Sequence, residues 1–474
     1  MTAITAVGAY APRFRITAEA FEEAWGQFQA AGITEKAVPA ADEDPLTMAY
    51  EAASRALEAA DLESERIDWL GVASSCPPTA EEDLTARLGA MLALRSDATF
   101  HLFSGSTRAG TRALWAGVDA LEGDSAVALV VAADAPRGDP DDAIDHAAGA
   151  GAAAFVLESD GPAPIVDRAE YTAVYPGTRF RNTGDAETQG PGVTQYDRQA
   201  FTETIAGAVA DLECDLEPDA AAIQAPNGSL PYRASGAAGI GTETIRAGAT
   251  VHELGDLGAA SVPVSLASSL AAGHECVLAV SHGSGAGADA FVVDLEREVP
   301  SATALDGDGT LSYVEYLRQR GVVTTGPPAG GGAYVSIPTW RRSLPQRYRL
   351  EAGRCPDCGA LAFPPDGACR DCNSLAEYEP LELSGAGTVE AVTTISQGGA
   401  PPEFAEQQAQ SGEYAAAIVA LETDDGEQAV SVPAMGTGAD HGSFGVGDRV
   451  ETTIRRVYTQ EGVTRYGFKI RPAE

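Results

Sequence analysis

Apolar runs and helical patterns alternate along the chain from its start to about residue 297. Five runs rich in Val, Ala and Leu predict strands, namely Asp68–Ser75, Ser125–Asp134, Gly151–Leu157, Ala221–Ala225 and Val277–Val280. Asp44 and Pro45 predict the start of a helix, because Asp caps free backbone N–H groups and Pro suits a first turn; apolar residues follow at helical spacing to Leu57. Apolar strands that alternate with helices predict a layered α/β fold with buried sheets.

The last third of the chain has a different pattern of apolar and loop-forming residues. Ser312–Arg320 predicts a short helix, and residues 324–332, dense in Pro and Gly, predict a linker. Short strand-like segments follow, separated by loops rich in Gly, Asp and Pro: Gly387–Ile395, Tyr414–Leu421, Gln428–Val432, Arg449–Val457 and Thr464–Ile470. This pattern predicts a small β-barrel.

Four of the seven cysteines form two C-x2-C pairs, Cys355 with Cys358 and Cys369 with Cys372. The short spacing lets each pair aim both sulfurs at one ion, and a Gly or Asn after each pair tolerates the left-handed backbone of such a turn. Two pairs make a closed thiolate site, which suits structural Zn²⁺. A redox pair or two disulfides are the alternatives; a reducing cytosol and the lack of a surrounding thioredoxin-like βαβ unit disfavour them.

The chain carries a net charge of −38, and Lys36 and Lys469 are its only lysines. Dispersed negative charge disfavours binding to nucleic acid or to anionic membranes. It is typical of proteins that work in molar salt, where a screening length of about 3 Å relieves self-repulsion. We therefore expect a halophilic protein that needs molar salt for stability; an ordinary acidic cytosolic protein is the alternative.

The chain shows no predicted membrane or export segment. Its longest run without a polar side chain, Ala147–Leu157, is shorter than the roughly 20 residues that a membrane helix needs. The first ten residues lack the basic and apolar regions of a secretory signal. We expect a cytoplasmic protein.

Several segments resemble archaeal hydroxymethylglutaryl-CoA (HMG-CoA) synthases, over about 320 residues. The matching segments are Ile4–Ile16, Asp42–Leu57, the stretch around Gly255 and Asp256, Val280–Phe291, and Tyr316–Gly321. The resemblance implies a thiolase-like layered α/β fold of two similar halves, with the active site between them.

The C-terminal part resembles the zinc-ribbon plus OB-fold proteins that accompany archaeal thiolases and HMG-CoA synthases. The matching segments are Leu344–Leu350, the two cysteine pairs, Phe363–Pro365, Leu383–Val389, Pro402–Phe404 and Tyr466–Pro472. This resemblance implies association with acyl-CoA and a bridging role toward a thiolase. The predicted domains are therefore the synthase-like body 1–323, a linker 324–333, an extension and zinc ribbon 334–380, and an OB-fold domain 381–474.

The resemblance assigns three catalytic positions, and each holds a different residue type. The family's nucleophilic cysteine, at a helix start, corresponds to Thr107; its histidine, before Pro-Asn-Gly, to Gln224; and its glutamate, after an early strand, to Ser75. A hydroxyl is a weak nucleophile without an adjacent base, and an amide does not accept a proton. The three replacements together predict that standard HMG-CoA synthesis is lost.

Other residues remain candidates for chemistry or binding. Cys76, or the serines beside Thr107, are alternative nucleophiles, and His282 is the one candidate acid or base among the histidines. The predicted ligand contacts are Asn227 in the Pro-Asn-Gly motif, the turn residues Gly283, Ser284 and Gly285, and Arg179 and Arg181 as phosphate contacts of coenzyme A. A solvated arginine pair is the alternative for the last two.

These observations lead to one principal hypothesis and two rivals. The first is an acyl-CoA-binding, synthase-like subunit with lost or altered chemistry that partners a thiolase, with structural zinc and a CoA thioester as ligand. The second is an active acyltransferase or a retro-aldol enzyme that makes or breaks a C–C bond next to a CoA thioester. The third is a purely structural subunit. We expect a homodimer or a larger complex.

Overall fold

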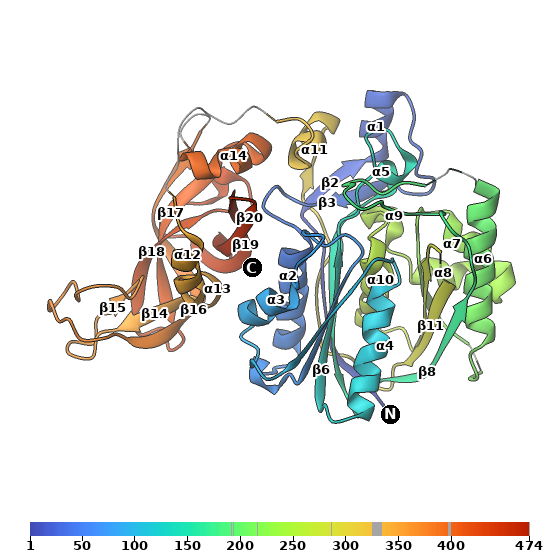
Figure 1. Ribbon diagram of the computed structural model, residues 1–474, viewed down its shortest axis with the longest axis horizontal. Coiled ribbons are helices and arrows are strands. Elements are labelled where there is room, and N and C mark those ends of the chain that lie inside the picture. The colour runs from blue at the N-terminus through green and yellow to red at the C-terminus, as the bar shows by residue number, and fades with distance from the viewer. Residues whose placement is uncertain are drawn as a thin grey trace. The chain divides into compact units, whose positions relative to one another are not determined.

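The computed structural model describes residues 1–190, 192, 194–215, 217–285, 287–324, 334–396 and 400–473. The chain forms two compact units, Met1–Tyr316 and Leu317–Glu474 (Figure 1). The predicted linker 324–333 lies outside the described residues except for Thr324. The finer borders predicted at residues 323, 333 and 380 stay predictions.

A ten-stranded mixed sheet runs through the first unit, in the order β5, β4, β6, β7, β1, β8, β11, β10, β9, with β12 beside β1. Its strands are β1 (Ala3–Tyr10), β4 (Trp69–Ser74), β5 (Thr99–Ser104), β6 (Val127–Asp134), β7 (Gly151–Glu158), β8 (Ala163–Thr172), β9 (Ala220–Ile223), β10 (Cys276–Gly283), β11 (Gly287–Asp294) and β12 (Ser301–Ala304). A small second sheet holds β2 (Phe14–Thr17), β3 (Glu35–Val38) and β13 (Gly309–Thr310). The five strands predicted in this region are confirmed as β4, β6, β7, β9 and β10.

The large sheet consists of two similar halves. The first contains the neighbours β4, β6, β7 and β1, and the second contains β9, β10, β11 and β8. In each half the third of these strands is antiparallel to the other three. The halves meet where the start of β1 pairs with the start of β8, Ala3 with Pro164 and Ile4 with Ala163. The predicted two-half α/β architecture is confirmed.

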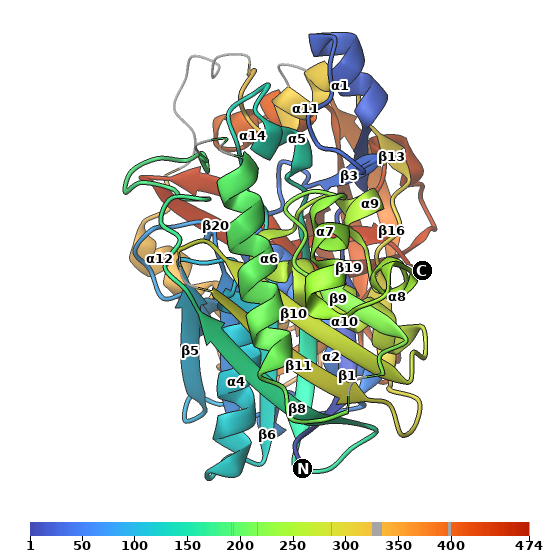
Figure 2. The ribbon, with the colours of Figure 1, turned by 90° about the vertical axis from the view of Figure 1, so that its right-hand side faces the viewer.

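Helices cover the sheet halves in layers. The principal ones are α2 (Pro45–Ala59), α4 (Ala109–Glu122), α6 (Thr194–Ala210) and α10 (Ser261–Ala271); α1 (Ala18–Trp25), α3 (Thr85–Met91), α5 (Ala143–Ala147), α7 (Leu230–Ala238), α8 (Thr242–Ala247), α9 (Val251–Leu254), η1 (Ser64–Arg66) and η2 (Gly258–Ala260) are shorter. Figures 1 and 2 show α4 and α10 between the two halves, α2 outside the first, and α6 outside the second. Side chains of β10 alternate accordingly: Val277 and Ala279 join the core with α4 and α10, while Leu278 and Val280 join the core with α6.

The predicted start of α2 is confirmed. The Asp44 side chain accepts hydrogen bonds from the backbone N–H groups of Leu46 and Thr47, and the Thr47 hydroxyl accepts one from the N–H of Asp44. This reciprocal arrangement is a capping box. The helix then packs closely on β1, since a Cβ atom at Gly8 would lie 2.1 Å from the carbonyl oxygen of Ala52.

The second unit is mainly antiparallel sheet. It contains α12 (Ile337–Arg342), α13 (Leu344–Arg349), β14 (Glu351–Arg354), β15 (Leu361–Ala362), β16 (Glu379–Ile395), η3 (Pro402–Phe404), α14 (Ala405–Ser411), β17 (Tyr414–Thr423), β18 (Ala429–Met435), η4 (His441–Ser443), β19 (Arg449–Gln460) and β20 (Val463–Pro472). The helix predicted at Ser312–Arg320 is α11 (Tyr313–Gln319), which precedes them.

The strands of the second unit pair in a ring. β16 pairs with both β17 and β19, β17 with β18, and β19 with β20. A parallel bridge between Gly436, just after β18, and Ile470 on β20 completes the circuit. All five strands predicted here are present, and the assignment of the ring to the OB type stays a prediction.

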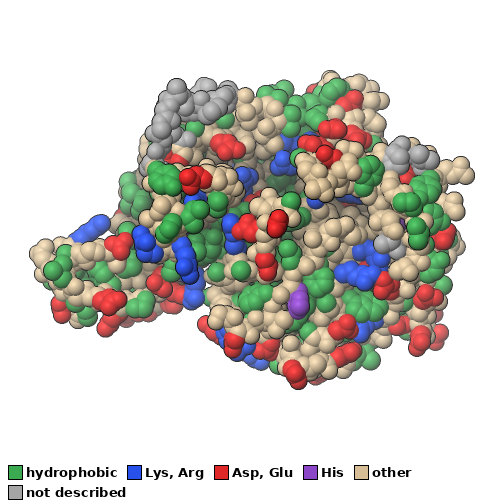
Figure 3. Space-filling view, viewed as in Figure 1, with side chains coloured by type: hydrophobic (Ala, Val, Ile, Leu, Met, Phe, Trp, Pro, Cys, Tyr) green, Lys and Arg blue, Asp and Glu red, His purple; other side chains and the backbone are tan. Residues whose placement is uncertain are grey.

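The surface is acidic, and its cations are arginines. Lys36 and Lys469 are each only 1% exposed. The blue side chains scattered among the red ones in Figure 3 are therefore almost entirely arginine. Within the described part of the chain, no helix combines the length and the hydropathy needed to cross a membrane.

Candidate functional site

Polar groups of the first unit gather where β4, β6, β9 and β10 end. Asp134, the last residue of β6, is fully buried. Its Oδ1 accepts hydrogen bonds from the Ser74 hydroxyl at 2.9 Å and from the N–H and thiol of Cys76 at 2.9 and 2.6 Å. Its Oδ2 accepts from the N–H and hydroxyl of Ser75 at 3.0 and 2.5 Å, and from the N–H of Ala259 at 2.7 Å. One carboxylate thus fixes the loop after β4 to the segment before α10.

Thr107 lies immediately before the start of α4. Its hydroxyl donates a hydrogen bond to the backbone carbonyl of His282 at 2.6 Å. Beneath it, the guanidinium of Arg108 is buried against Asp289, and Asp289 also accepts from the Thr111 hydroxyl at 2.9 Å. The predicted nucleophile position therefore carries a hydroxyl whose proton is held by the neighbouring strand, on a rigidly anchored helix start.

Gln224 follows β9 and is 1% exposed. Its Nε2 donates to the carbonyl of Gly258 at 3.0 Å, while its Oε1 has no hydrogen-bond partner. A Cβ atom at Gly258 would lie 2.3 Å from Asp134 Oδ2 and 3.1 Å from Ser75 Oγ. Gly258 therefore lies between Gln224 and Ser75 in space. Gln224 Oε1, at the position of the family's histidine, is an acceptor without a hydrogen-bond partner.

His282, near the end of β10, is buried, with 8% of its surface exposed. Burial, then the charges of Arg108 and Arg179, lower the pKa of its imidazole to about 4, so the ring is neutral at pH 7. Its Nδ1 lies 2.8 Å from the Thr204 hydroxyl, which donates to the carbonyl of Ala200 at 2.8 Å. This network assigns the proton to Nδ1 and leaves a lone pair on Nε2.

The two arginines predicted as phosphate contacts bond to protein groups. Arg179 forms an ion pair with the buried Asp256. Burial lowers the pKa of Arg179, but the charges of Asp256 and Asp134 outweigh it and raise the pKa overall. Arg181 donates from Nη2 to the carbonyl of Ser75 at 2.7 Å. Arg179 Nη2 is buried without a partner, so one donor of this pair remains for a ligand.

The remaining predicted ligand contacts have structural partners. Gly283 packs against the segment that precedes α4, since a Cβ atom there would lie 2.4 Å from Ser106 Oγ. The hydroxyl of Ser284 accepts from the N–H of Arg179 at 2.8 Å, and Gly285 has a left-handed φ of 83°. Asn227 Oδ1 accepts from the N–H groups of Ser229 and Leu230 at the start of α7. Ser284 therefore contacts the Arg179 backbone, and the Asn227 side chain is engaged in the turn before α7.

Cys76 is joined to the same cluster through Asp134. Burial, and then the adjacent Asp134 charge, raise the pKa of its thiol well above the ordinary value. The sulfur also accepts a hydrogen bond from the N–H of Ala135 at 3.3 Å. A thiol is the weak form of a cysteine nucleophile, so this environment opposes a nucleophilic role.

The sequence interpretation missed Asp134, Asp256 and Thr204 as site residues. Asp134 ends a predicted strand and Asp256 lies in a segment matched to the family, but neither motif marks a carboxylate as functional. Only the polar end of an otherwise apolar strand could have signalled Asp134. Nothing in the helical pattern around Thr204 points to His282, 78 residues away.

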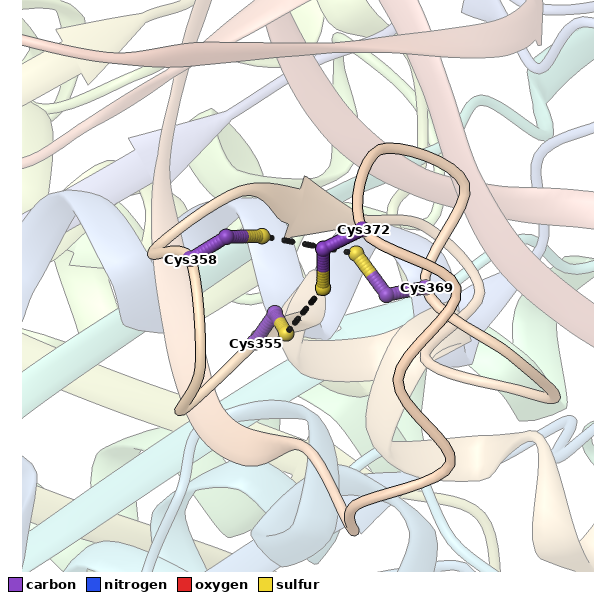
Figure 4. A group of neighbouring side chains, drawn as sticks. All are labelled: Cys355, Cys358, Cys369 and Cys372. Carbon is purple, nitrogen blue, oxygen red and sulfur yellow. Dashed lines mark hydrogen bonds between the residues drawn. The ribbon is translucent and has the colours of Figure 1, made fainter.

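The four paired cysteines of the second unit converge as predicted (Figure 4). Their sulfurs all lie within 4.8 Å of one another; Cys355 Sγ is 3.7 Å from Cys372 Sγ, and Cys358 Sγ is 3.6 Å from Cys369 Sγ. A Zn–S bond of about 2.3 Å in tetrahedral geometry separates its sulfurs by about 3.8 Å. The spacing fits Zn²⁺ and excludes disulfides, and all four cysteines are free.

The two halves of this cluster share one local geometry. The N–H of Gly359 donates to the carbonyl of Cys355 at 2.8 Å, and the N–H of Asn373 donates to that of Cys369 at 2.9 Å. Gly359 and Asn373 have left-handed φ angles of 77° and 58°. Both features confirm the turns predicted from the residue types, and a bound ion would lock the ribbon's two loops together.

Comparison with known families identifies the cysteine region independently. Residues 342–376 match the family of the ChsH2 rubredoxin-like zinc ribbon domain. The match includes all four cysteines and α13.

The chain is similar to HMG-CoA synthases over about two thirds of its length. The chain is 30% identical over 343 residues to the hydroxymethylglutaryl-CoA synthase of Methanocella arvoryzae, covering 68% of this chain and 98% of that protein. It is 31% identical over 350 residues to that of Methanopyrus kandleri, covering 68% and 95%. A solved HMG-CoA synthase complexed with CoA aligns with a TM-score of 0.59 at 16% identity, over 71% of this chain and 94% of that one.

Proposed function

The chain belongs to the hydroxymethylglutaryl-CoA synthase family, and from this premise we propose that its first unit binds an acyl-CoA thioester but does not carry out the standard synthase reaction. One observation carries the proposal. The residues at the three predicted catalytic positions, Thr107, Gln224 and Ser75, each donate a side-chain hydrogen bond to a protein oxygen.

The chemistry of these three groups supports the proposal. The Thr107 hydroxyl donates its proton to the backbone carbonyl of His282, and this contact supplies no basic group that could remove the proton. The Gln224 amide takes up no proton, and the Ser75 hydroxyl is no base. Removing one nucleophile from a comparable covalent mechanism lowers turnover on the order of a million-fold.

The second unit supports a role as a partner subunit. We propose that its four cysteines hold structural Zn²⁺ and that the ribbon and its sheet form the bridge from the synthase-like body to a thiolase. Zinc in a closed four-thiolate site stabilises the fold of the ribbon and leaves no open coordination position for substrate. The fusion of both units in one chain keeps their local concentrations high without a tight interface.

The test mixes the full-length chain with acetyl-CoA and acetoacetyl-CoA and measures HMG-CoA by mass spectrometry. We expect binding of acetyl-CoA in calorimetry, no HMG-CoA, and no acyl adduct on Cys76, Ser106 or Thr107. The triple variant T107C/Q224H/S75E restores the family residue types, and its acyl adduct on residue 107 would support the assigned positions. HMG-CoA from the unmodified chain would refute the proposal.

The partner role has its own test. We expect the chain to co-purify from its own cells with a thiolase, and to change the yield or thermal stability of that thiolase when both are co-expressed. A thiolase whose activity and stability are the same with and without the chain would contradict the role. The oligomeric state, measured by light scattering, is predicted to be a dimer or larger.

A second function is favoured by the environment of His282. Because the Thr204 contact assigns the ring proton to Nδ1, Nε2 is the atom that would take a proton from a β-hydroxyl group of a bound acyl-CoA. The Cα–Cβ bond then breaks to give a carbonyl compound and a thioester enolate, which regains a proton at Cα. Incubation with 3-hydroxyacyl-CoA esters and detection of acetyl-CoA or propionyl-CoA tests this retro-aldol activity, and H282Q should abolish it.

A further inference from the structure

Two arginines of the second unit converge on one tryptophan. Arg347 comes from α13 and Arg465 from β20, and their guanidinium carbons lie 5.1 and 5.4 Å from the centre of the Trp340 ring. The stem of Arg347 crosses β20 at Gly467, where a Cβ atom would lie 3.4 Å from Arg347 Cδ. Tyr458, paired with Arg465 across β19 and β20, stacks edge-on against Trp340 at 5.8 Å.

Neither guanidinium has a carboxylate partner among the described residues. Arg465 is only 2% exposed, and its Nε and Nη2 atoms are buried without a hydrogen-bond partner. Arg347 is partly exposed, and its partial burial lowers its pKa, an effect that the phenol of Tyr458 opposes. Both arginine charges lower the pKa of Tyr458 and the Glu403 carboxylate raises it, so these polar groups lie near one another, but no ion pair joins Glu403 to either arginine among the described residues.

This arrangement is costly for a protein that stands alone. Two like charges beside one ring repel each other, and the two unpaired donors of the buried Arg465 lose their bonds to water. Stacking on an aromatic ring recovers a small part of that loss. The chain has 69 acidic residues and 31 basic ones. Two neighbouring arginines without a carboxylate partner are therefore unexpected in this protein.

We propose that Arg347, Arg465 and Tyr458, on the platform of Trp340, form an anion site of the second unit that binds a phosphoryl group. Two guanidinium forks present donors in the planar geometry that phosphate oxygens accept. A phosphate monoester carries a charge of about −1.5 to −2 near pH 7, which balances two arginines, whereas a carboxylate balances one. This inference does not rest on acyl-CoA binding by the first unit.

The experiment uses the full-length chain at fixed ionic strength and inorganic phosphate as the probe. Calorimetry measures the dissociation constant, and thermal unfolding measures the shift of Tm with phosphate. We expect saturable binding, and a loss of at least about tenfold in affinity in R347Q and in R465Q, because each removes charged hydrogen bonds. R349Q is the matched control: Arg349 lies on the same helix, is exposed, and already pairs with Glu382.

A stability readout separates an anion site from a merely structural arginine. Without phosphate, R465Q should unfold at the same temperature as the unmodified chain or higher, because the substitution removes an uncompensated buried charge. Phosphate should then raise the Tm of the unmodified chain and of R349Q but not of R465Q. A lower Tm of R465Q together with an unchanged response to phosphate would overturn the proposal, as would the absence of saturable phosphate binding.

Two further probes identify the source of the phosphoryl group. Acetate that bound as tightly as phosphate would refute the preference for a dianion. Coenzyme A and its 3′-dephospho form are then compared in the unmodified chain and in R465Q. A preference for coenzyme A that R465Q removes assigns the site to the 3′-phosphate of the nucleotide; equal binding of the two forms, with phosphate still bound, assigns it to free phosphate.

Discussion

Replacing Asp134 by Asn tests the polar cluster of the first unit most directly. The substitution keeps the size of the side chain, removes its charge and turns one of its two acceptor oxygens into a donor. Each oxygen of Asp134 accepts three hydrogen bonds in the structure. The amide nitrogen therefore faces three donors in either orientation.

The expected loss of stability follows from which donors can turn away. With the nitrogen at Oδ1, the Ser74 hydroxyl and the Cys76 thiol can rotate, but the backbone N–H of Cys76 keeps only its longer hydrogen bond of 3.3 Å to the Ser74 hydroxyl. A buried donor that loses its main acceptor costs up to about 1–3 kcal/mol, and the three remaining bonds to residue 134 change from charged to neutral. We therefore expect D134N to lower the free energy of unfolding of the first unit by about 3 kcal/mol.

Urea unfolding in concentrated KCl, followed by tryptophan fluorescence, measures this change without adding a denaturing salt. S74A is the control, since it removes one neutral donor to Asp134 and the longer second acceptor of the Cys76 N–H, and should cost about 1 kcal/mol. D134N should also speed alkylation of Cys76 near pH 8, because the Asp134 charge that raises the thiol pKa is gone; the C76S variant gives the background from other cysteines. Stability within about 0.5 kcal/mol of the unmodified chain, with unchanged alkylation of Cys76, would refute the reasoning.

Three other predictions concern zinc, pH and salt. Metal analysis should find one zinc ion per chain, and C358S should lose it and lower the Tm of the second unit; a full complement of zinc in C358S would contradict the site. The unfolded state binds the His282 proton below about pH 6.5, and the folded state binds it only below about pH 4. The free energy of unfolding should therefore decrease as pH falls from about 6.5 to about 4. At roughly 1.4 kcal/mol per pKa unit, the total decrease is about 3 kcal/mol. H282Q should flatten that slope in urea titrations run at several pH values. Urea unfolding should be repeated in about 0.2 to 3 M KCl, where the screening length falls from about 7 to about 2 Å. We expect the free energy of unfolding to rise with the salt concentration; an unchanged free energy would contradict the halophilic interpretation.

The sequence determined those features of the protein that depend on neighbours in the chain. Apolar runs placed the strands to within a few residues, because a buried strand needs continuous apolar side chains. Asp44 and Pro45 placed the start of α2 through local capping. Gly359 and Asn373 predicted two left-handed turns. Together with the spacing of the cysteines, they allowed the four-sulfur cluster to be predicted from the sequence.

Only the tertiary structure decided what surrounds the chemistry. The replaced residues at 75, 107 and 224 were visible in the sequence, but the hydrogen bonds that hold them reach Asp134, the His282 carbonyl and the Gly258 carbonyl. The meeting of Arg347 and Arg465 on Trp340 was equally hidden, since these residues lie on different elements. Hydrogen bonds and burial between distant segments arise from packing in three dimensions, and no local periodicity records which donor will meet which acceptor.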